Sequence, residues 1–322
     1  MKRMNEKHKV IVICGPTASG KTALSIELAK KINGEIVSAD SMQIYKDMDI
    51  GTAKPTKQEM GEIKHYLLDF VSPEDRYSVA QYKQDAKKSI KEIINKGKTP
   101  IIVGGTGLYV DSLIYEIEYN DIKLDEEYRK KLEKIAEEQG LEELYKKAVE
   151  IDPEAMKKIS QNDKKRIMRV LEIYHSTGKT KTEQEIESRK NPVEYDYRVF
   201  AINWDREILY QRINKRVDIM VDQGLIEEVK EILNKYDKFP TAMQGLGYKE
   251  VVDYLNGIYT KEEMIEKIKL ETRRYAKRQL TWFRKNKQTI WLDGTNDIQN
   301  NINIILEGIN WKREKKQIKK EL

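Results

Sequence analysis

The chain has little cysteine, histidine or phenylalanine, and it has no long apolar run. Cys14 is the only cysteine among 322 residues, so an internal disulfide is excluded. The three histidines are scattered along the sequence and do not have metal-ligand spacing. No apolar stretch approaches the roughly 20 residues of a membrane-spanning helix. The basic start of the chain leads into only a brief apolar stretch, so we expect no signal peptide, no membrane segment and a cytoplasmic location.

Charged residues, by contrast, are abundant. They make up 35% of the chain, against 39% hydrophobic residues, and the formal net charge is +6. This composition is typical of a helix-rich protein with long solvated helix faces. The positive charge is concentrated between residues 273 and 287, where arginines and lysines alternate with Tyr275, Trp282 and Phe283 and no acidic residue occurs. Such a stretch suits a polyanion with stackable bases, although a solvated helix face above core aromatics is the commoner explanation of a charge run.

The most informative segment is a phosphate-binding loop. A short apolar strand, residues 9–13, leads into G-x-x-x-x-G-K-T, and a helical pattern follows. In this motif glycines let backbone N–H groups converge, the helix N-terminus adds positive potential, the lysine reaches anionic oxygens, and the threonine hydroxyl can bind Mg²⁺. We therefore predict a diphosphate or triphosphate site formed by Gly15, Pro16, Thr17, Ala18, Ser19, Gly20, Lys21 and Thr22.

The order of the predicted elements indicates an α/β fold. Apolar strands are predicted at residues 9–13, 35–38, 99–103, 197–202 and 289–292, separated by helical patterns such as residues 79–94. Alternating strands and helices favour a parallel sheet flanked by helices, as in P-loop NTPases. From residue 121 the pattern is helical without a strand. We expect a core formed by residues 1–120 and 196–322 and an all-helical insertion domain at 121–195.

A carboxylate follows the second predicted strand. Asp40 comes directly after residues 35–38, at the sheet edge that carries the phosphate loop. It could act on a group that meets the bound phosphate, or it could cap a turn or contact Mg²⁺ through water. The third strand ends in Gly104-Gly105-Thr106-Gly107 and lacks the carboxylate that a motor or switch NTPase needs there.

Together these segments resemble bacterial tRNA dimethylallyltransferases. The resemblance spans nearly the whole chain and rests on residues 15–22, 38–46, 48–55, 103–109 and 276–283. It implies transfer of a dimethylallyl group from its diphosphate to the exocyclic amine of the adenosine 3′ of the anticodon. Asp40 is then the general base, because an adenine amine is a poor nucleophile until its proton is taken. Lys21, the loop amides and Mg²⁺ on Thr22 stabilise the departing diphosphate.

The resemblance also implies further site residues. Arg216 occupies the position of a diphosphate-binding arginine, whereas Arg212, one helical turn earlier, could share that role or be a solvated neighbour. Thr106 and Arg129 match positions that touch tRNA, although a surface ion pair accounts for Arg129 nearly as well. Residues 244–249 match a tRNA-contact segment only in part.

Other tRNA contacts follow from the residues themselves. The target base must leave its stack to be modified, and Asp40, Ser41, Met42 and Gln43 are the candidates for holding it. In the predicted insertion, Lys165, Arg166 and Arg169 have helical spacings that place them on one side of a helix, where they could bind phosphates.

Two other functions remain open at this level. A P-loop kinase would use the same loop and would use Asp40 to activate an acceptor hydroxyl. A non-catalytic RNA-binding protein could use the loop as a nucleotide switch. The sequence leaves open whether ATP binds the loop, and a monomer is expected only by default.

Overall fold

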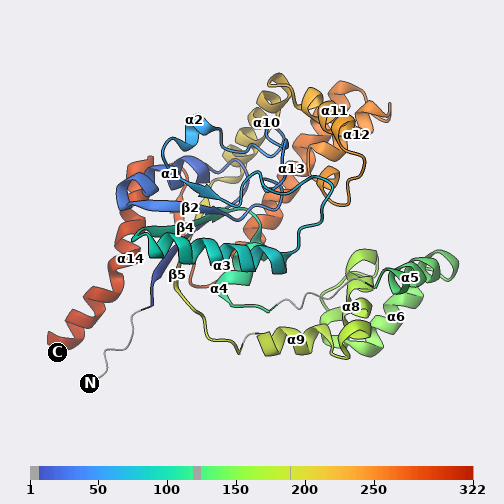
Figure 1. The fold of residues 1–322 in the computed structure, drawn as a ribbon, viewed down its shortest axis with the longest axis horizontal. Helices are drawn as coiled ribbons and strands as arrows, with labels where there is room; N and C mark the ends of the chain where they lie inside the picture. The colour runs from blue at the N-terminus through green and yellow to red at the C-terminus, as the bar shows by residue number, and fades with distance from the viewer. Residues whose placement is uncertain (1–6, 119–124, 189, 322) are drawn as a thin grey trace. The chain divides into compact units, whose positions relative to one another are not determined.

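Six parallel strands form the centre of the larger part of the chain in this computed structural model (Figure 1). They are β1 (Lys9–Cys14), β2 (Gly34–Ser38), β3 (His65–Tyr66), β4 (Thr99–Gly104), β5 (Asp196–Asn203) and β6 (Ile290–Asp293). Their order in the sheet is β3-β2-β4-β1-β5-β6. The predicted α/β fold with a parallel sheet is therefore confirmed. The sequence pattern missed β3, because two residues are too short to show a period.

The structure describes residues 7–118, 125–188 and 190–321, with side chains up to residue 309. The chain divides into two compact units. One combines Met1–Ile114 with Glu194–Leu322, and the other is Tyr115–Val193. The first unit is thus built from two separate stretches of sequence, and the sheet lies entirely within it.

Alternation along β1 distributes the core over both faces of the sheet. Val10 and Val12 face α3 (Val79–Asn95) and α4 (Gly107–Ile114). Ile11 and Ile13 face α1 (Lys21–Ile32) and α14 (Ile298–Glu321). All four side chains are at most 1% exposed. Successive side chains of a strand point to opposite faces of the sheet. A strand that is apolar at every position is therefore typical of a parallel sheet covered on both sides.

A second group of helices lies beyond the sheet. It consists of α10 (Arg206–Asp222), α11 (Leu225–Lys235), the 3₁₀ turn η1 (Ala242–Gln244), α12 (Tyr248–Leu255) and α13 (Lys261–Phe283). In Figure 1 these brown and orange helices gather on the side of the sheet away from α14. They share a core with Ile44, Tyr45 and Met48, which belong to the loop that follows β2. The short α2 (Lys57–Met60) ends this loop region.

In the second unit, all the regular secondary structure of the described residues is helical. It comprises α5 (Glu126–Glu138), α6 (Leu141–Ile151), α7 (Pro153–Met156), α8 (Lys164–Thr177) and α9 (Lys181–Ser188). Leu132, Leu144 and Ile167, from three of these helices, are at most 3% exposed and form its core. Asp152 caps α7 and also accepts hydrogen bonds from Thr182 at 2.9 and 2.6 Å.

Cys14 is buried at the end of β1. Burial raises the pKa of its thiol to about 12, so the thiol stays protonated and unreactive at neutral pH. It donates a hydrogen bond to the carbonyl of Phe200 at 3.3 Å. Within the described part of the chain, none of the helices has both the length and the hydropathy that crossing a membrane requires.

At Gly104, the end of β4 packs directly against the backbone of Ala39, the residue that precedes Asp40. A Cβ at this position would lie 2.0 Å from the carbonyl oxygen of Ala39, which is backbone and cannot turn away. We expect Gly104→Ala to lower the free energy of unfolding by about 1–3 kcal/mol in urea titrations. The control Lys30→Ala removes only an exposed ion pair with Glu27 and should change stability by less than about 0.5 kcal/mol. Equal stability of the two variants would contradict this packing.

Candidate active site

The phosphate loop, Gly15–Thr22, connects β1 to α1 and has an unusual backbone. Gly15 and Gly20 have φ values of +145° and +92°, which favour glycine. Ala18 also has a positive φ, +61°. A non-glycine residue in this region stores strain of order 1–3 kcal/mol, and such strain is characteristic of ligand-binding loops.

Side chains hold the carbonyl groups of this loop. Lys21 Nζ donates to the carbonyl of Pro16 at 2.6 Å, Arg212 Nε donates to that of Ala18 at 2.9 Å, and Trp204 Nε1 donates to that of Ser19 at 3.0 Å. The guanidinium of Arg212 also stacks over the Trp204 ring, 4.3 Å from its centroid. Arg212 is therefore a structural partner of the loop, and sequence reasoning had left its role open. Trp204 was missed altogether.

Gln279 joins α13 to two parts of the site. Its Oε1 accepts from the backbone N–H of Thr17 at 2.9 Å, and its Nε2 donates to the carbonyl of Gly105 at 2.9 Å. The side chain is buried, and a Cβ on Gly105 would lie 2.2 Å from Nε2. Gln279 lies within residues 276–283, but no spacing in the sequence indicated a contact with the phosphate loop.

A cavity of about 730 Å³ opens beside the loop. Its lining includes Lys21, Thr22, Arg212 and Arg216. Ser19 also lines it, and within the described part of the chain its buried hydroxyl has no hydrogen-bond partner. Cationic groups, loop amides and an unsatisfied hydroxyl around one cavity are suited to an anion with several oxygens.

The cations of this cavity influence one another. Burial, together with the charge of Arg216, lowers the pKa of Lys21 to about 8, and the negative charge of Asp40 partly opposes this. Burial also lowers the pKa of Arg216, while Asp40 and Glu59 act in the opposite direction. Asp40, Lys21 and Arg216 therefore lie close enough to interact electrostatically.

Asp40 has both a structural and a free oxygen. Its Oδ1 accepts from the backbone N–H groups of Met42 at 2.9 Å and Gln43 at 3.3 Å, which is the predicted turn-capping role. Among the described residues, its Oδ2 has no hydrogen-bond partner. The cap fixes the carboxyl group, so one side chain can both cap the turn and present an oxygen to a ligand.

Ser41, which follows β2, and Thr106, which follows β4, come together. The backbone N–H of Ser41 donates to Thr106 Oγ1 at 3.0 Å, and the Thr106 hydroxyl donates to Ser41 Oγ at 3.2 Å. Burial raises the pKa of Tyr275, and the charge of Asp40 adds to this effect, which places the α13 tyrosine beside the same group. The loop after β2, the end of β4 and α13 thus meet around Asp40.

The other predicted tRNA residues belong to the second unit. Arg129 on α5 pairs with Glu133 at 3.5 Å and with the buried Glu172 at 3.2 Å. Arg169 lies 3.6 Å from Glu172, and Arg166 pairs with Asp163 at 2.9 Å. Lys165, Arg166 and Arg169 lie outside the buried stripe of α8, on its solvent side.

The basic stretch of α13 has two distinct faces. Phe283 is 3% exposed in the core, Trp282 packs on the same core and donates to Asp111 at 2.9 Å, and Tyr275 is half-buried. The interpretation of these aromatics as base-stacking groups is therefore not supported. Within residues 273–287 the exposed side chains are Thr281 and six cations: Arg274, Lys277 and Arg278 on α13, and Arg284, Lys285 and Lys287 directly after it.

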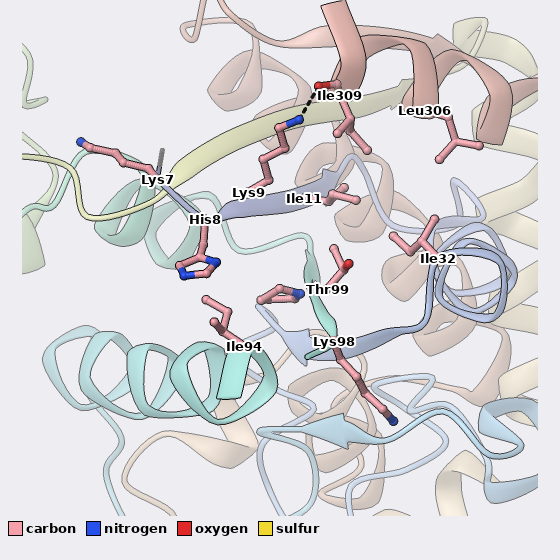
Figure 2. A pocket seen from close by; sticks show the side chains of 11 residues that line it. Lys7, His8, Lys9, Ile11, Ile32, Ile94, Lys98, Thr99, Leu306 and Ile309 are labelled. Carbon is pink, nitrogen blue, oxygen red and sulfur yellow. Dashed lines mark hydrogen bonds between the residues drawn. The ribbon is translucent and has the colours of Figure 1, made fainter. Parts of the chain in front are cut away.

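A second cavity, of about 440 Å³, lies at the opposite, amino-terminal ends of β1 and β4 (Figure 2). Lys7, His8, Lys98 and Thr99 line part of it. Lys9 donates there to the carbonyl of Ile309 at 3.1 Å, which ties β1 to α14. The cavity gathers none of the predicted site residues, in agreement with the rule that ligands of open α/β sheets bind at the carboxyl ends of the strands.

The fold and site define a P-loop α/β protein in which an anion cradle after β1 and a carboxylate after β2 lie at the same edge of the sheet, with β4 between the two strands. The comparisons with known proteins are specific. The model of the family described as IPP transferase matches residues 43–286. The chain belongs to this family.

Relatives align over most of their length. A tRNA dimethylallyltransferase of Acetivibrio thermocellus is 55% identical over 285 residues, covering 88% of this chain and 91% of that protein. One of Bacillus anthracis is 49% identical over 290 residues, covering 90% and 92%. The resemblance recognised in the sequence is thereby confirmed.

Solved structures agree with these relatives. The tRNA isopentenylpyrophosphate transferase of Bacillus halodurans has a TM-score of 0.72 and 41% identity, covering 97% of this chain and all of that one. A eukaryotic dimethylallyltransferase, described as acting on tRNA, has a TM-score of 0.79 and 33% identity, covering 94% and 80%.

The lowered pKa of Lys21 generates a pH prediction. Because this pKa is about 8 in the free protein and a bound anion raises it, Lys21 must take up a proton when inorganic diphosphate binds above pH 8. Affinity should fall with rising pH, by at most about tenfold per unit. Calorimetry in two buffers of different ionisation enthalpy measures the proton uptake. In the control variant Lys21→Met, only the titration of diphosphate itself contributes to proton uptake. A proton uptake identical to that of the wild type would exclude Lys21 as the acceptor.

Proposed function

We propose that this chain transfers a dimethylallyl group from dimethylallyl diphosphate to the exocyclic amine of the adenosine 3′-adjacent to the anticodon in tRNA, giving isopentenyladenosine. The observation that carries the proposal is the electrostatic grouping of Asp40 with Lys21 and Arg216 at the phosphate loop. A base and a leaving-group site at the same edge of one sheet are what an amine nucleophile and a departing diphosphate require. The family and its relatives support the same reaction.

In this reaction the adenine nitrogen bonds to the allylic carbon as the carbon–oxygen bond to diphosphate breaks. Asp40 accepts the proton that the amine loses. Lys21, Arg216 and the amides of residues 15–22 stabilise the negative charge that develops on the diphosphate oxygens. The buried hydroxyl of Ser19, which has no hydrogen-bond partner among the residues that the structure describes, supplies a further donor to the diphosphate.

The same residues suit Mg²⁺. The described residues contain no group of three or more histidine, cysteine or acidic side chains that could hold a metal ion alone. Mg²⁺ commonly binds through one or two protein oxygens together with substrate phosphates and waters, so Thr22 at the edge of the cavity fits. When bound, the ion would neutralise charge on the diphosphate.

Several regions are proposed to contact tRNA. Asp40, Ser41, Met42, Gln43 and Thr106 form the part nearest the target base. Arg129, Lys165, Arg166 and Arg169 of the second unit, with the exposed cations of α13, would bind backbone phosphates. The buried partner of Arg129 and Arg169, Glu172, would hold both guanidinium groups in place. We further propose that the protein acts in the cytoplasm as a monomer.

One experiment separates this function from that of a P-loop kinase. The chain is incubated with dimethylallyl diphosphate and unmodified tRNA, and in parallel with labelled ATP and a panel of metabolites. We expect isopentenyladenosine in the digested tRNA, detected by mass spectrometry. Phosphate transfer without prenylation would establish the kinase, and RNA binding without either product would establish a binding protein.

Replacing Asp40 tests its role as the base. Because the carboxylate acts only as charge moves in the transition state, Asp40→Ala should lower turnover by about a hundredfold or more, while tRNA affinity changes by less than about twofold. Single-turnover prenylation and filter binding measure the two quantities. The exposed Asp222→Asn on α10 is the control and should match the wild type. Loss of tRNA binding with intact turnover would contradict the assignment.

The exposed arginines of α13 lead to a prediction about how tRNA affinity depends on salt concentration. Each phosphate contact contributes about 0.7–0.9 to the slope of log affinity against log salt concentration. Neutralising Arg274 and Arg278 to glutamine should therefore weaken tRNA binding and reduce this slope by about 1–2. The control neutralises Lys30 and Lys31, exposed lysines in the last turn of α1. Unchanged slopes in the α13 variant would assign those arginines to a solvated face.

A further inference from the structure

Glu228 on α11 holds the loop that follows β2. Its carboxylate accepts hydrogen bonds from three consecutive backbone N–H groups, those of Asp49 at 2.9 Å, Ile50 at 2.6 Å and Gly51 at 3.0 Å. The hydroxyl of Tyr248 on α12 donates to the same carboxylate at 2.6 Å. An ionised carboxylate that accepts four hydrogen bonds is a strong and directional anchor.

Two close contacts fit the loop onto these helices. A Cβ on Gly51 would lie 2.5 Å from the ring of Tyr248, which is only 1% exposed and cannot move away. A Cβ on Gly245 would lie 2.4 Å from the terminal methyl group of Met42. Residues 244–249, which matched a tRNA-contact segment only in part, therefore pack against the loop that follows β2.

The anchored loop in turn holds Gln43. The amide nitrogen of Gln43 donates to the carbonyls of Thr52 at 3.2 Å and Ala53 at 3.1 Å, directly after the three residues bound by Glu228. Both hydrogens of this amide are then used, and the orientation of the amide group is fixed. Its carbonyl oxygen accepts no hydrogen bond among the described residues. Gln43 lies three residues after Asp40, whose Oδ1 accepts from its backbone N–H at 3.3 Å.

We propose that Glu228 is a positioning residue for base recognition: it fixes the loop carbonyls that orient Gln43, so that the Gln43 carbonyl oxygen accepts an N–H of the target adenine. This inference rests on the proposed function. A fixed amide can accept but not donate, so it favours a base with an amine at that edge over a base with a carbonyl oxygen there. Without Glu228 the amide can rotate, and this preference is lost.

The test compares Glu228→Gln with its matched control Glu227→Gln. The control removes an exposed carboxylate one residue away on the same helix. In Glu228→Gln, an NH₂ group replaces one oxygen and opposes the backbone N–H groups. The affinities of each variant are measured for two anticodon stem-loops, one with adenosine at the target position and one with purine riboside, which lacks the amine. Calorimetry with inorganic diphosphate measures the integrity of the phosphate loop.

We expect the preference for adenosine over purine to fall by about three- to tenfold in Glu228→Gln, in keeping with the loss of one hydrogen bond. Gln43→Met should show the same fall, Tyr248→Phe a smaller one, and Glu227→Gln none. Diphosphate affinity should stay within about twofold of the wild type in all four, because the phosphate loop is held by other residues.

Three outcomes decide the matter. The inference is overturned if the wild type forms isopentenyladenosine but Glu228→Gln and Gln43→Met both keep the wild-type preference for adenosine. A parallel loss of diphosphate and stem-loop affinity in Glu228→Gln would show general destabilisation and would also overturn it. Absence of any product from the wild type would instead overturn the proposed function, and this inference with it.

Discussion

The phosphate loop depends on how its carbonyl groups are held. Three of them accept hydrogen bonds from Lys21, Arg212 and Trp204, and the buried amide of Gln279 joins the loop to β4. A peptide group is a dipole whose positive end is the N–H group. Holding the loop carbonyls toward the protein therefore directs the N–H groups of neighbouring amides toward the opposite side. A strained loop would otherwise relax, so residues about 190 and 260 positions later in the chain preserve the conformation of residues 15–22.

Local signals predicted the sheet well. The apolar runs of β1, β2, β4, β5 and β6, bounded by glycine and polar residues, were enough to give strand positions and a parallel sheet. The two-residue β3 carries too little pattern to be recognised. For the basic stretch of α13 the sequence left two interpretations open. The structure favours a solvated face above core aromatics, because Trp282 and Phe283 pack in the core while the arginines beside them are exposed. Composition alone cannot separate the two faces of one helix without knowing what the helix packs against.

The candidate site shows the same limit. Motif spacing identified the phosphate loop, and strand order placed Asp40 at the same edge of the sheet. The side chains that support these groups, Gln279, Trp204 and Glu228, come from distant helices and have no motif of their own. Their roles are set by tertiary contacts, which a single sequence does not record. The capping of Asp40 by the N–H groups of residues 42 and 43 also shows that a structural role and a chemical role can belong to one carboxylate.

The pairing of β1 with β5 has a consequence for synthesis. Lys9 is in register with Asp196, across the whole of the second unit. A chain leaving the ribosome therefore exposes one edge of its central strand until nearly two hundred residues have emerged, whereas α5 to α9 are complete earlier and contact only near neighbours in sequence. The helical unit can form first, and the sheet is completed last by a slow long-range closure, during which that open edge is most vulnerable to aggregation.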